Sequence, residues 1–255
     1  MKNCLLILLF AFFVLPFNSN AQTTEAPTML AVFDNDVPPS KVSEFENVVK
    51  EQLPFMKKYD LKWSYYIYQT DDNHYWWVCP IHNLNEYKEQ EEDWIKFQSL
   101  LEKEEGFVGS IQFLEKINSI KPMIFQWLPD VTYIPEGSSP KYDQPQFFNM
   151  GMCYIKVGFV QEFLTNQRKW VKLFEDNQLQ AGWNFYAGVI GTENPFYMWG
   201  ETYDSEIDRA TAREKAFSQV SEETSKLWNE ALQYMRKFET KRGWYRPDLS
   251  YIVEN

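Results

Sequence analysis

The sequence predicts an α+β protein made of two similar halves, and three observations support this prediction. The 255 residues are 44% hydrophobic and 18% aromatic, with 10 Gly and 13 Pro, which excludes a disordered or low-complexity chain. Short β-prone runs alternate with helical patterns in each half. An eight-residue motif at the C-terminus also repeats one that stands 118 residues earlier. A length near 250 fits one large domain or two smaller ones.

The first 21 residues have the three-part layout of a secretory signal peptide. Lys2 precedes an apolar stretch from Leu5 to Phe17, and Ser19 and Ala21 place small residues at −3 and −1 of a cleavage point. The stretch is too short for an ordinary transmembrane helix, and an uncleaved anchor is the alternative. We therefore expect residues 1–21 to be removed and the chain to be exported to the periplasm or the outside, with no membrane span.

The net charge and the small number of Cys and His residues limit the kinds of partner and metal that the chain is expected to bind. The formal net charge is −11, which repels the phosphate backbone of nucleic acids and excludes them as partners. Cys79 and Cys153 remain after cleavage; each lies in an apolar run, where a thiol behaves as a buried hydrophobe, and their pairing stays open. The two histidines, His74 and His82, have no further Cys or His at zinc-site spacing, so we expect neither a metal nor a cofactor.

The repeated motif predicts a tandem duplication. Residues 129–136 read PDVTYIPE and residues 247–254 read PDLSYIVE, so five of eight positions are identical. Other residues match in the same order at offsets between 117 and 121, and any one of these matches could arise by chance but the ordered series could not. We predict repeats at 28–136 and 147–255, joined by a turn-rich linker at 137–146.

Each repeat begins with a strand, a helix and a hairpin. Residues 29–33 and 150–157 are short, apolar and β-prone. Apolar residues at helical spacing follow, and Pro54 is expected to kink or divide the first of these helices. The hairpins pair residues 63–69 with 75–79, and 183–190 with 196–199.

The second part of each repeat is predicted as helices and a final strand. Asn83 with Glu86 resembles a capping box, and Ser205 with Asp208 is a weaker version. The repeated motif itself is predicted as the last strand. A further helical pattern precedes it, made of Leu114, Ile117 and Ile120 in the first copy and Leu232, Met235 and Phe238 in the second.

The resulting order, β-α-β-β-α-α-β, is ferredoxin-like, with a four-stranded antiparallel sheet and helices on one face. The face of each sheet that carries no helices must be packed against another element. We therefore expect the two sheets to pack face to face within one chain, as a monomer with an internal pseudo-dimer.

A family resemblance supports this architecture. The sequence YIKVG at 154–158, with Glu162-Phe163, and Gly182-Trp183 through Tyr197-Met198-Trp199, resembles the dimeric α+β-barrel superfamily, particularly its NIPSNAP-like branch. Proteins similar to antibiotic-biosynthesis monooxygenases belong to the same superfamily. The resemblance spans both halves but includes no diagnostic catalytic motif, so it informs the fold more than the activity.

Aromatic residues of the hairpins supply the candidate ligand-binding residues. Alternation with a period of two separates a set that packs under helices (Trp63, Tyr65, Ile67, Trp183, Phe185, Ala187 and Val189) from a more polar set that faces between the sheets (Ser64, Tyr66, Tyr68, Asn184, Tyr186 and Ile190). Tyr133 and Tyr251 of the repeated motif join Tyr66, Tyr68, Asn184 and Tyr186 as candidates for lining a cavity. Their alternative role is packing, with hydroxyls satisfied locally.

Three ionisable residues are weak catalytic candidates. Asp130 and Asp248 each follow a Pro in the repeated motif, where they would be anchors or general bases at a pocket rim, or acids that bind turn amides. His74 lies in the first hairpin turn, and either it or His82 would be a general base, or the axial ligand that the resemblance implies for haem-handling members.

The sequence leaves three functions open. The leading hypothesis is an exported accessory protein that binds a small apolar or aromatic ligand. The second is a cofactor-independent oxygenase or isomerase of the kind that the resemblance implies, and the third is a structural or interaction module with no cavity. A pocket where a carboxylate or imidazole meets tyrosines would favour the enzyme, whereas an aromatic pocket without such groups would favour the binding protein.

Overall fold

The computed structural model describes residues 28–107, 109–138 and 143–253, and its elements follow the predicted β-α-β-β-α-α-β order twice. The predicted signal peptide and part of the predicted linker lie outside the described residues. The first half contains β1 (Met29–Asp36), α1 (Val42–Lys58), β2 (Tyr66–Thr70), β3 (His74–Ile81), α2 (Leu84–Glu105), α3 (Gly109–Leu114) and β4 (Ser119–Trp127). The second half contains β5 (Phe147–Ile155), α4 (Val160–Asp176), β6 (Asn184–Ile190), β7 (Phe196–Tyr203), α5 (Glu206–Gln219), α6 (Ser221–Tyr234) and β8 (Met235–Tyr245).

The eight strands form one closed antiparallel barrel in the order β1-β3-β2-β8-β5-β7-β6-β4. Each half contributes four neighbouring strands, β4-β1-β3-β2 and β8-β5-β7-β6, and the halves join at β2–β8 and β4–β6. The sequence predicted two sheets facing each other. The structure adds hydrogen bonds between their edges, because closure into a barrel removes the unpaired edges that two separate sheets would expose.

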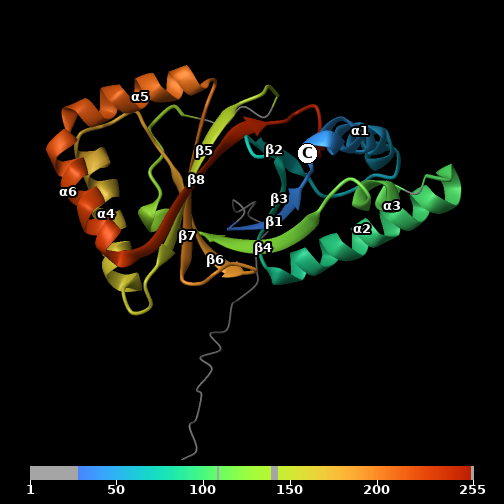
Figure 1. Cartoon of the computed structure of the whole chain (residues 1–255), viewed down its shortest axis with the longest axis horizontal. Coiled ribbons are helices and arrows are strands. Elements are labelled where there is room, and N and C mark those ends of the chain that lie inside the picture. The colour runs from blue at the N-terminus through green and yellow to red at the C-terminus, as the bar shows by residue number, and fades with distance from the viewer. Residues whose placement is uncertain (1–27, 108, 139–142, 254–255) are drawn as a thin grey trace, which may run out of the picture.

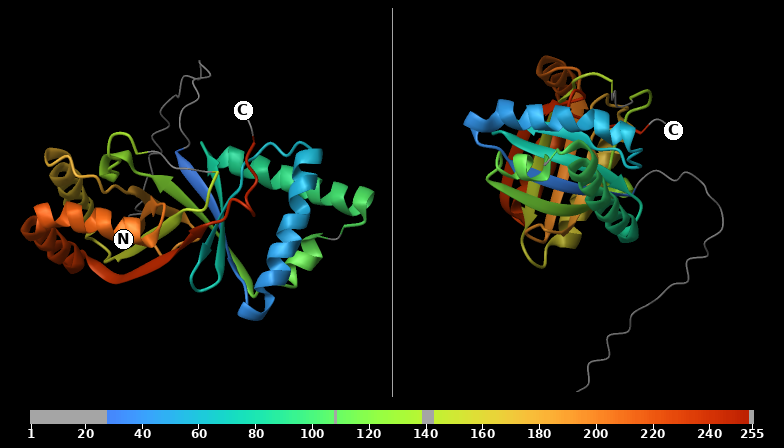
Figure 2. Two further views of the ribbon diagram at one scale, coloured as in Figure 1. Left: turned by 90° about the horizontal axis from the view of Figure 1, so that it is seen from above. Right: turned by 90° about the vertical axis from the view of Figure 1, so that its right-hand side faces the viewer.

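The helices form two layers on opposite sides of the barrel. Figure 1 shows α1–α3 on one side and α4–α6 on the other, with the strands between them, and the left view of Figure 2 shows the same separation from above. Apolar side chains accordingly form clusters under each helical layer and a separate cluster inside the barrel. Among the described residues no helix is both long and apolar enough to cross a bilayer.

The predicted alternation of faces is correct over most of the hairpins. Tyr65 and Ile67 pack under the first helical layer, whereas Tyr68 and Tyr186 pack against the cluster inside the barrel. Val189 and Ile190 are exceptions, since both are exposed at the end of β6. The register of β4 against β6 shifts near this end, which interrupts the alternation.

The prediction that the repeated motif forms the last strand is wrong. The last strands are β4 and β8, and they end before the motif. In the first half the motif begins as a 3-10 turn (Pro129–Val131), and Tyr133 then forms an isolated bridge with Trp183 of the second half. Tyr251 forms the matching bridge with Tyr65 of the first half. Each motif is therefore an arm that crosses onto the opposite half.

The structure confirms the predicted caps of two helices and corrects the predicted extent of others. Asn83 caps α2 and Ser205 caps α5, as expected. However, Pro54 does not divide α1, because Val49 and Met56 on either side of it are buried in the same cluster and hold one continuous helix. The predicted helical pattern before the motif also runs too far, since Ile120 lies in β4, and Met235 and Phe238 lie in β8.

The two cysteines of the described chain are free and buried. Cys79 lies in the cluster under the first helical layer, and Cys153 lies in the cluster under the second. Burial raises the pKa of both thiols, that of Cys153 to about 12, so each behaves as a small apolar side chain.

Candidate functional site

A half-open cavity of about 530 Å³, here called the barrel cavity, extends from inside the barrel to the loops at residues 133–138 and 180–183. Its inner wall is apolar and comes from both halves: Leu30, Val32, Trp76, Val78, Phe148, Met150 and Met198. Four of the six predicted ligand-binding residues line it, namely Tyr68, Tyr133, Asn184 and Tyr186. These four residues therefore line one cavity, and their role in binding a ligand stays a prediction.

The other two predicted tyrosines do not line this cavity. Tyr66 packs against Tyr245, with ring centroids 6.4 Å apart. The Tyr251 hydroxyl donates a hydrogen bond to the Leu61 carbonyl over 2.9 Å. Tyr133 makes the equivalent bond to the Leu179 carbonyl over 2.8 Å, so its hydroxyl is also used by the fold.

Asp130 and Asp248 bind arginines and do not line a described cavity. Asp130 accepts two hydrogen bonds from Arg168 on the surface. Asp248 accepts two from Arg246, which holds the pKa of this carboxyl at about 2. Arg246 also binds Glu46 with both of its terminal nitrogens and so ties the C-terminal arm to α1. Both aspartates are thus paired with arginines in the fold, and the lowered pKa makes Asp248 a poor general base.

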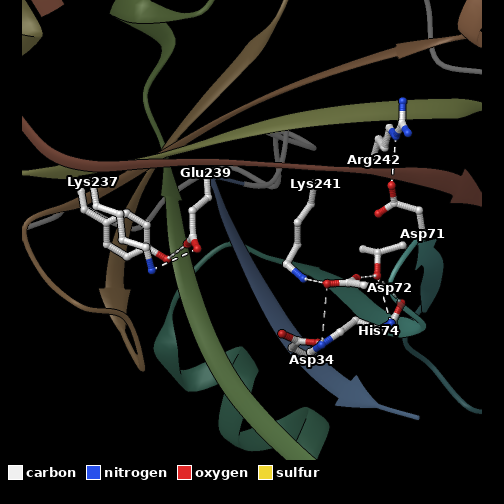
Figure 3. Close-up of polar contacts among 10 residues, drawn as sticks. Asp34, Asp71, Asp72, His74, Lys237, Glu239, Lys241 and Arg242 are labelled. Atoms are coloured by element: carbon white, nitrogen blue, oxygen red, sulfur yellow. Dashed lines mark hydrogen bonds and ion pairs between the residues drawn. The ribbon is translucent and has the colours of Figure 1, made fainter. Parts of the chain in front are cut away.

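His74 belongs to a polar network, drawn in Figure 3, that links the two halves. Its Nδ1 lies 2.7 Å from Asp34, and this hydrogen bond raises the pKa of His74. Asp72 lies 4.0 Å from the other ring nitrogen and receives a 2.6 Å bond from Lys241 of β8. His82 bonds with Glu86 instead. Neither histidine lines the cavities described here, so the residues of these cavities do not fit a histidine-ligated haem.

A second cavity, of about 300 Å³, lies between α2 and the sheet of the first half and is here called the α2 cavity. Six of its fourteen described lining residues are aromatic, and several of these rings contact one another. Trp77 lies edge-on to Trp94 and to Phe113, with centroids 5.9 and 5.5 Å apart. The aromatic lining residues are Phe33, Tyr65, Trp77, Tyr87, Trp94 and Phe113.

Three residues of the α2 cavity carry buried polar atoms without a hydrogen-bond partner among the described residues. They are the acceptor Gln52 Oε1 and the donors Trp77 Nε1 and Gln98 Nε2. Gln52 is 2% exposed and Trp77 6%. Each buried polar atom left unpaired costs about 1–3 kcal/mol, so these three atoms are candidates for pairing with a molecule or water in the cavity.

The titratable groups that line the α2 cavity are Tyr65, Tyr87 and Glu91. Burial raises the pKa of Tyr65, and burial together with the Glu91 carboxylate raises the pKa of Tyr87 to about 12. Both phenols therefore stay protonated at neutral pH. The Tyr87 hydroxyl donates to one carboxylate oxygen of Glu91 over 3.0 Å. The described wall of the cavity thus combines aromatic rings with one carboxylate that already accepts a hydrogen bond.

The corresponding space in the second half is mostly filled, leaving about 80 Å³. The Trp199 ring lies flat on β5, at a position where a side chain on Gly151 would overlap it. The Arg213 guanidinium lies 4.5 Å from the Phe217 centroid and also binds Glu201 over 2.7 Å. The two halves thus share strand order but differ in the space left under their helices.

No family model and no curated protein matches the chain, but solved structures do. An anthrone oxidase-like protein is 12% identical with a TM-score of 0.57, covering 87% of this chain and 92% of its own. A monooxygenase-like protein from Fusobacterium nucleatum is 9% identical with a TM-score of 0.54, covering 87% and 93%. A mutant chlorite dismutase from Candidatus Nitrospira defluvii is 12% identical with a TM-score of 0.51, covering 87% and 92%.

The chain therefore shares the fold of these proteins, an α+β architecture with a closed eight-stranded antiparallel barrel. These identities establish the architecture of this α+β barrel but not its chemistry, since one fold serves many activities. The barrel cavity contains residues that the sequence singled out, whereas the α2 cavity was missed. One signal for it was present: Gln52 stands four residues after Val48 and four before Met56, on the apolar stripe of α1. A glutamine on such a stripe needs a buried partner.

Proposed function

We propose that this protein binds a small aromatic molecule in the α2 cavity. The observation that carries the proposal is the set of three unpaired polar atoms on an aromatic wall: Gln52 Oε1, Trp77 Nε1 and Gln98 Nε2. Rings of the wall stack on a flat apolar body, and a hydroxyl or carbonyl on that body would pair with these atoms. A phenol or a quinone has this chemistry.

Isothermal titration calorimetry with 2-naphthol and naphthalene tests this binding site. We expect the protein to bind 2-naphthol about tenfold more tightly, because a hydrogen bond to Gln52 contributes about 1–1.5 kcal/mol. Gln52→Met keeps the length of the side chain but removes the acceptor, and should abolish the preference. Gln167→Met, next to the small space in the second half, is the matched control and should keep it. Absence of binding to either probe, or an unchanged preference in Gln52→Met, would contradict the proposal.

A cofactor-independent oxygenase or isomerase is the second candidate function. It is supported by the likeness to anthrone oxidase-like and monooxygenase-like proteins, whose names describe oxidation of organic molecules. The protonated tyrosines and the occupied Glu91 of the α2 cavity favour binding over catalysis. Consumption of oxygen during incubation with a phenol or an anthrone would favour the oxygenase over the binding protein. A module without a cavity, the third hypothesis, disagrees with the two cavities described here.

The proposal also covers the evolutionary origin of the chain and its location outside the cytoplasm. The equal element order and equal strand order of the halves support descent from one duplicated gene, with repeats at 28–136 and 147–255. Closure of the barrel within one chain supports a monomeric protein. The sequence resemblance alone supports a NIPSNAP-like ancestry. The layout of residues 1–21 supports export. Mass spectrometry of the secreted protein would detect Gln22 as its first residue.

A further inference from the structure

Three exposed apolar side chains line the α2 cavity. They are Ile95 of α2, Leu114 of α3 and Ile120 of β4, and they are 64%, 54% and 39% exposed. A side chain that lines a cavity and is also exposed to solvent lies at the rim of its opening. Because these three come from separate elements and meet at one cavity, they give it an opening with an apolar rim, here called the apolar mouth.

Polarity changes along the α2 cavity in the opposite direction from that of an ordinary pocket, whose rim is polar. Gln52 and Trp77, which carry polar atoms without a partner among the described residues, are buried, whereas the residues of the apolar mouth are exposed. Single apolar residues on a surface are ordinary, but a group of them at the opening of a cavity indicates a binding surface. A molecule gains most here if its polar end enters first and an apolar end stays at the mouth.

The charge near the apolar mouth is negative. Glu91 is the charged residue among the described lining residues of the α2 cavity; it is exposed and lies one helical turn before Ile95. It accepts a hydrogen bond from Tyr87. A carboxylate at this place disfavours an anionic group on the bound molecule, and the net charge of −11 acts in the same direction. The end of the molecule that lies at the mouth is therefore apolar and carries no negative charge.

We propose that the ligand of the α2 cavity is an alkyl-substituted phenol or quinone, whose oxygen-bearing ring lies inside and whose alkyl chain covers the apolar mouth. The inference rests on the proposed binding of an aromatic molecule and adds the chemical class of that molecule. The volume of about 300 Å³ accommodates a body of two fused rings, so a chain on the far end of that body reaches the mouth.

Isothermal titration calorimetry with 2-naphthol and 6-butyl-2-naphthol tests the inference. We expect the butyl compound to bind about tenfold more tightly, because each methylene group that is half removed from water gains about twofold in affinity. The double variant Ile95→Gln with Leu114→Gln should remove most of this gain and leave the affinity for 2-naphthol within about twofold. The matched control, Ile207→Gln with Leu232→Gln, replaces exposed residues on helices of the second half and should keep the gain.

The outcomes separate this inference from the proposed function. Equal affinity for the two naphthols, or a gain that survives in Ile95→Gln with Leu114→Gln, would overturn the inference while 2-naphthol binding still supports the proposed function. No binding of either naphthol would overturn both. Sedimentation velocity of the ligand-free protein checks a second copy as the occupant of the mouth: we expect a monomer, and a dimer that dissociates in the double variant would also overturn the inference.

Discussion

At the scale of single residues, Arg246 contributes more to the stability of the fold than either aspartate of the repeated motif. Its guanidinium binds Glu46 and Asp248 and also donates to Gln69 over 2.6 Å. The side chains of Arg246 and Glu46 are 19% and 16% exposed, so this pair is partly removed from water. The corresponding pair in the other arm, Arg168 with Asp130, is about half exposed on both sides. Exposed pairs contribute little, whereas a buried carboxylate that loses its partner is costly.

Replacing these two arginines should therefore have unequal effects. We expect Arg246→Met to lower stability by about 3 kcal/mol and the melting temperature by about 6–12 °C, because Glu46 is left buried without its cation. Arg168→Met, the matched control, should change stability by less than about 0.5 kcal/mol. Thermal unfolding followed by circular dichroism measures both. Equal effects of the two variants would contradict this interpretation.

The pH dependence of the same variant checks its cause. Arg246 lowers the pKa of Glu46 and lowers that of Asp248 to about 2, so their contribution to stability is complete above the pKa of the unfolded carboxyls. It is lost as pH falls from about 4 towards 2. The difference between wild type and Arg246→Met should be constant from pH 5 to 8 and shrink below pH 4.

At the scale of elements, the repeated motif forms two exchanged arms with matching contacts. Tyr133 and Tyr251 donate to the carbonyls of Leu179 and Leu61, each of which follows a helix of the opposite half. Thr132 and Ser250 likewise accept from strand amides across the same contacts. Each copy of the motif therefore contacts the opposite half in the same way.

Removing the tyrosine hydroxyls should weaken both arms to a similar degree. Tyr133→Phe and Tyr251→Phe each delete one hydrogen bond and leave one carbonyl unpaired, so we expect a loss of about 1–2 kcal/mol apiece. The two sites are on opposite halves, and the double variant should lose the sum. Urea unfolding measures all three free energies. If neither single variant changes stability, the carbonyls of Leu179 and Leu61 bind water equally well, and the tyrosine hydrogen bonds do not stabilise the arms.

Sequence patterns predicted the element order and the face of most strand residues, but not the last strand of each half. In β4, Pro122 lowers strand propensity, yet it precedes Ile124, where pairing with β6 begins, so its missing N–H is tolerated. In β8, charged residues alternate where apolar ones are expected: Glu239 accepts from Tyr154, and Lys241 binds Asp72. These polar partners come from distant segments, and local periodicity cannot reveal them.

The candidate sites were likewise predictable from the sequence only in part. Tyr68, Asn184 and Tyr186 were predicted to face the space between the sheets because alternation within one strand decides this. The α2 cavity depends on how far α2 and α3 lie from the sheet, and that distance follows from the packing of whole side chains. Gln52 was the one local sign of it, since its amide interrupts an apolar stripe.

At the scale of the whole molecule, the two joins between the halves decide whether the barrel is closed. At β2–β8 only three residue pairs are in register, Tyr68–Tyr245, Gln69–Trp244 and Thr70–Gly243. Gly243 lies so close to β2 that a Cβ atom there would be 1.9 Å from the Gln69 carbonyl oxygen. Because this neighbour is backbone, it cannot move aside without separating the strands.

A methyl group at this join should therefore open the barrel. We expect Gly243→Ala to lower stability by about 3 kcal/mol or more, since overpacking against backbone breaks the β2–β8 hydrogen bonds. Hydrogen exchange should quicken most at the amides of Asp71 and Arg246, which bond across this join to Arg242 and Ile67. Gly200→Ala is the matched control, because its nearest neighbour is a Met150 side-chain atom at 3.8 Å, and its stability should stay within about 1 kcal/mol of wild type. If both variants unfold alike, or if exchange at the join is unchanged in Gly243→Ala, closure at β2–β8 does not hold the halves together, and the β4–β6 join and the arms must do so.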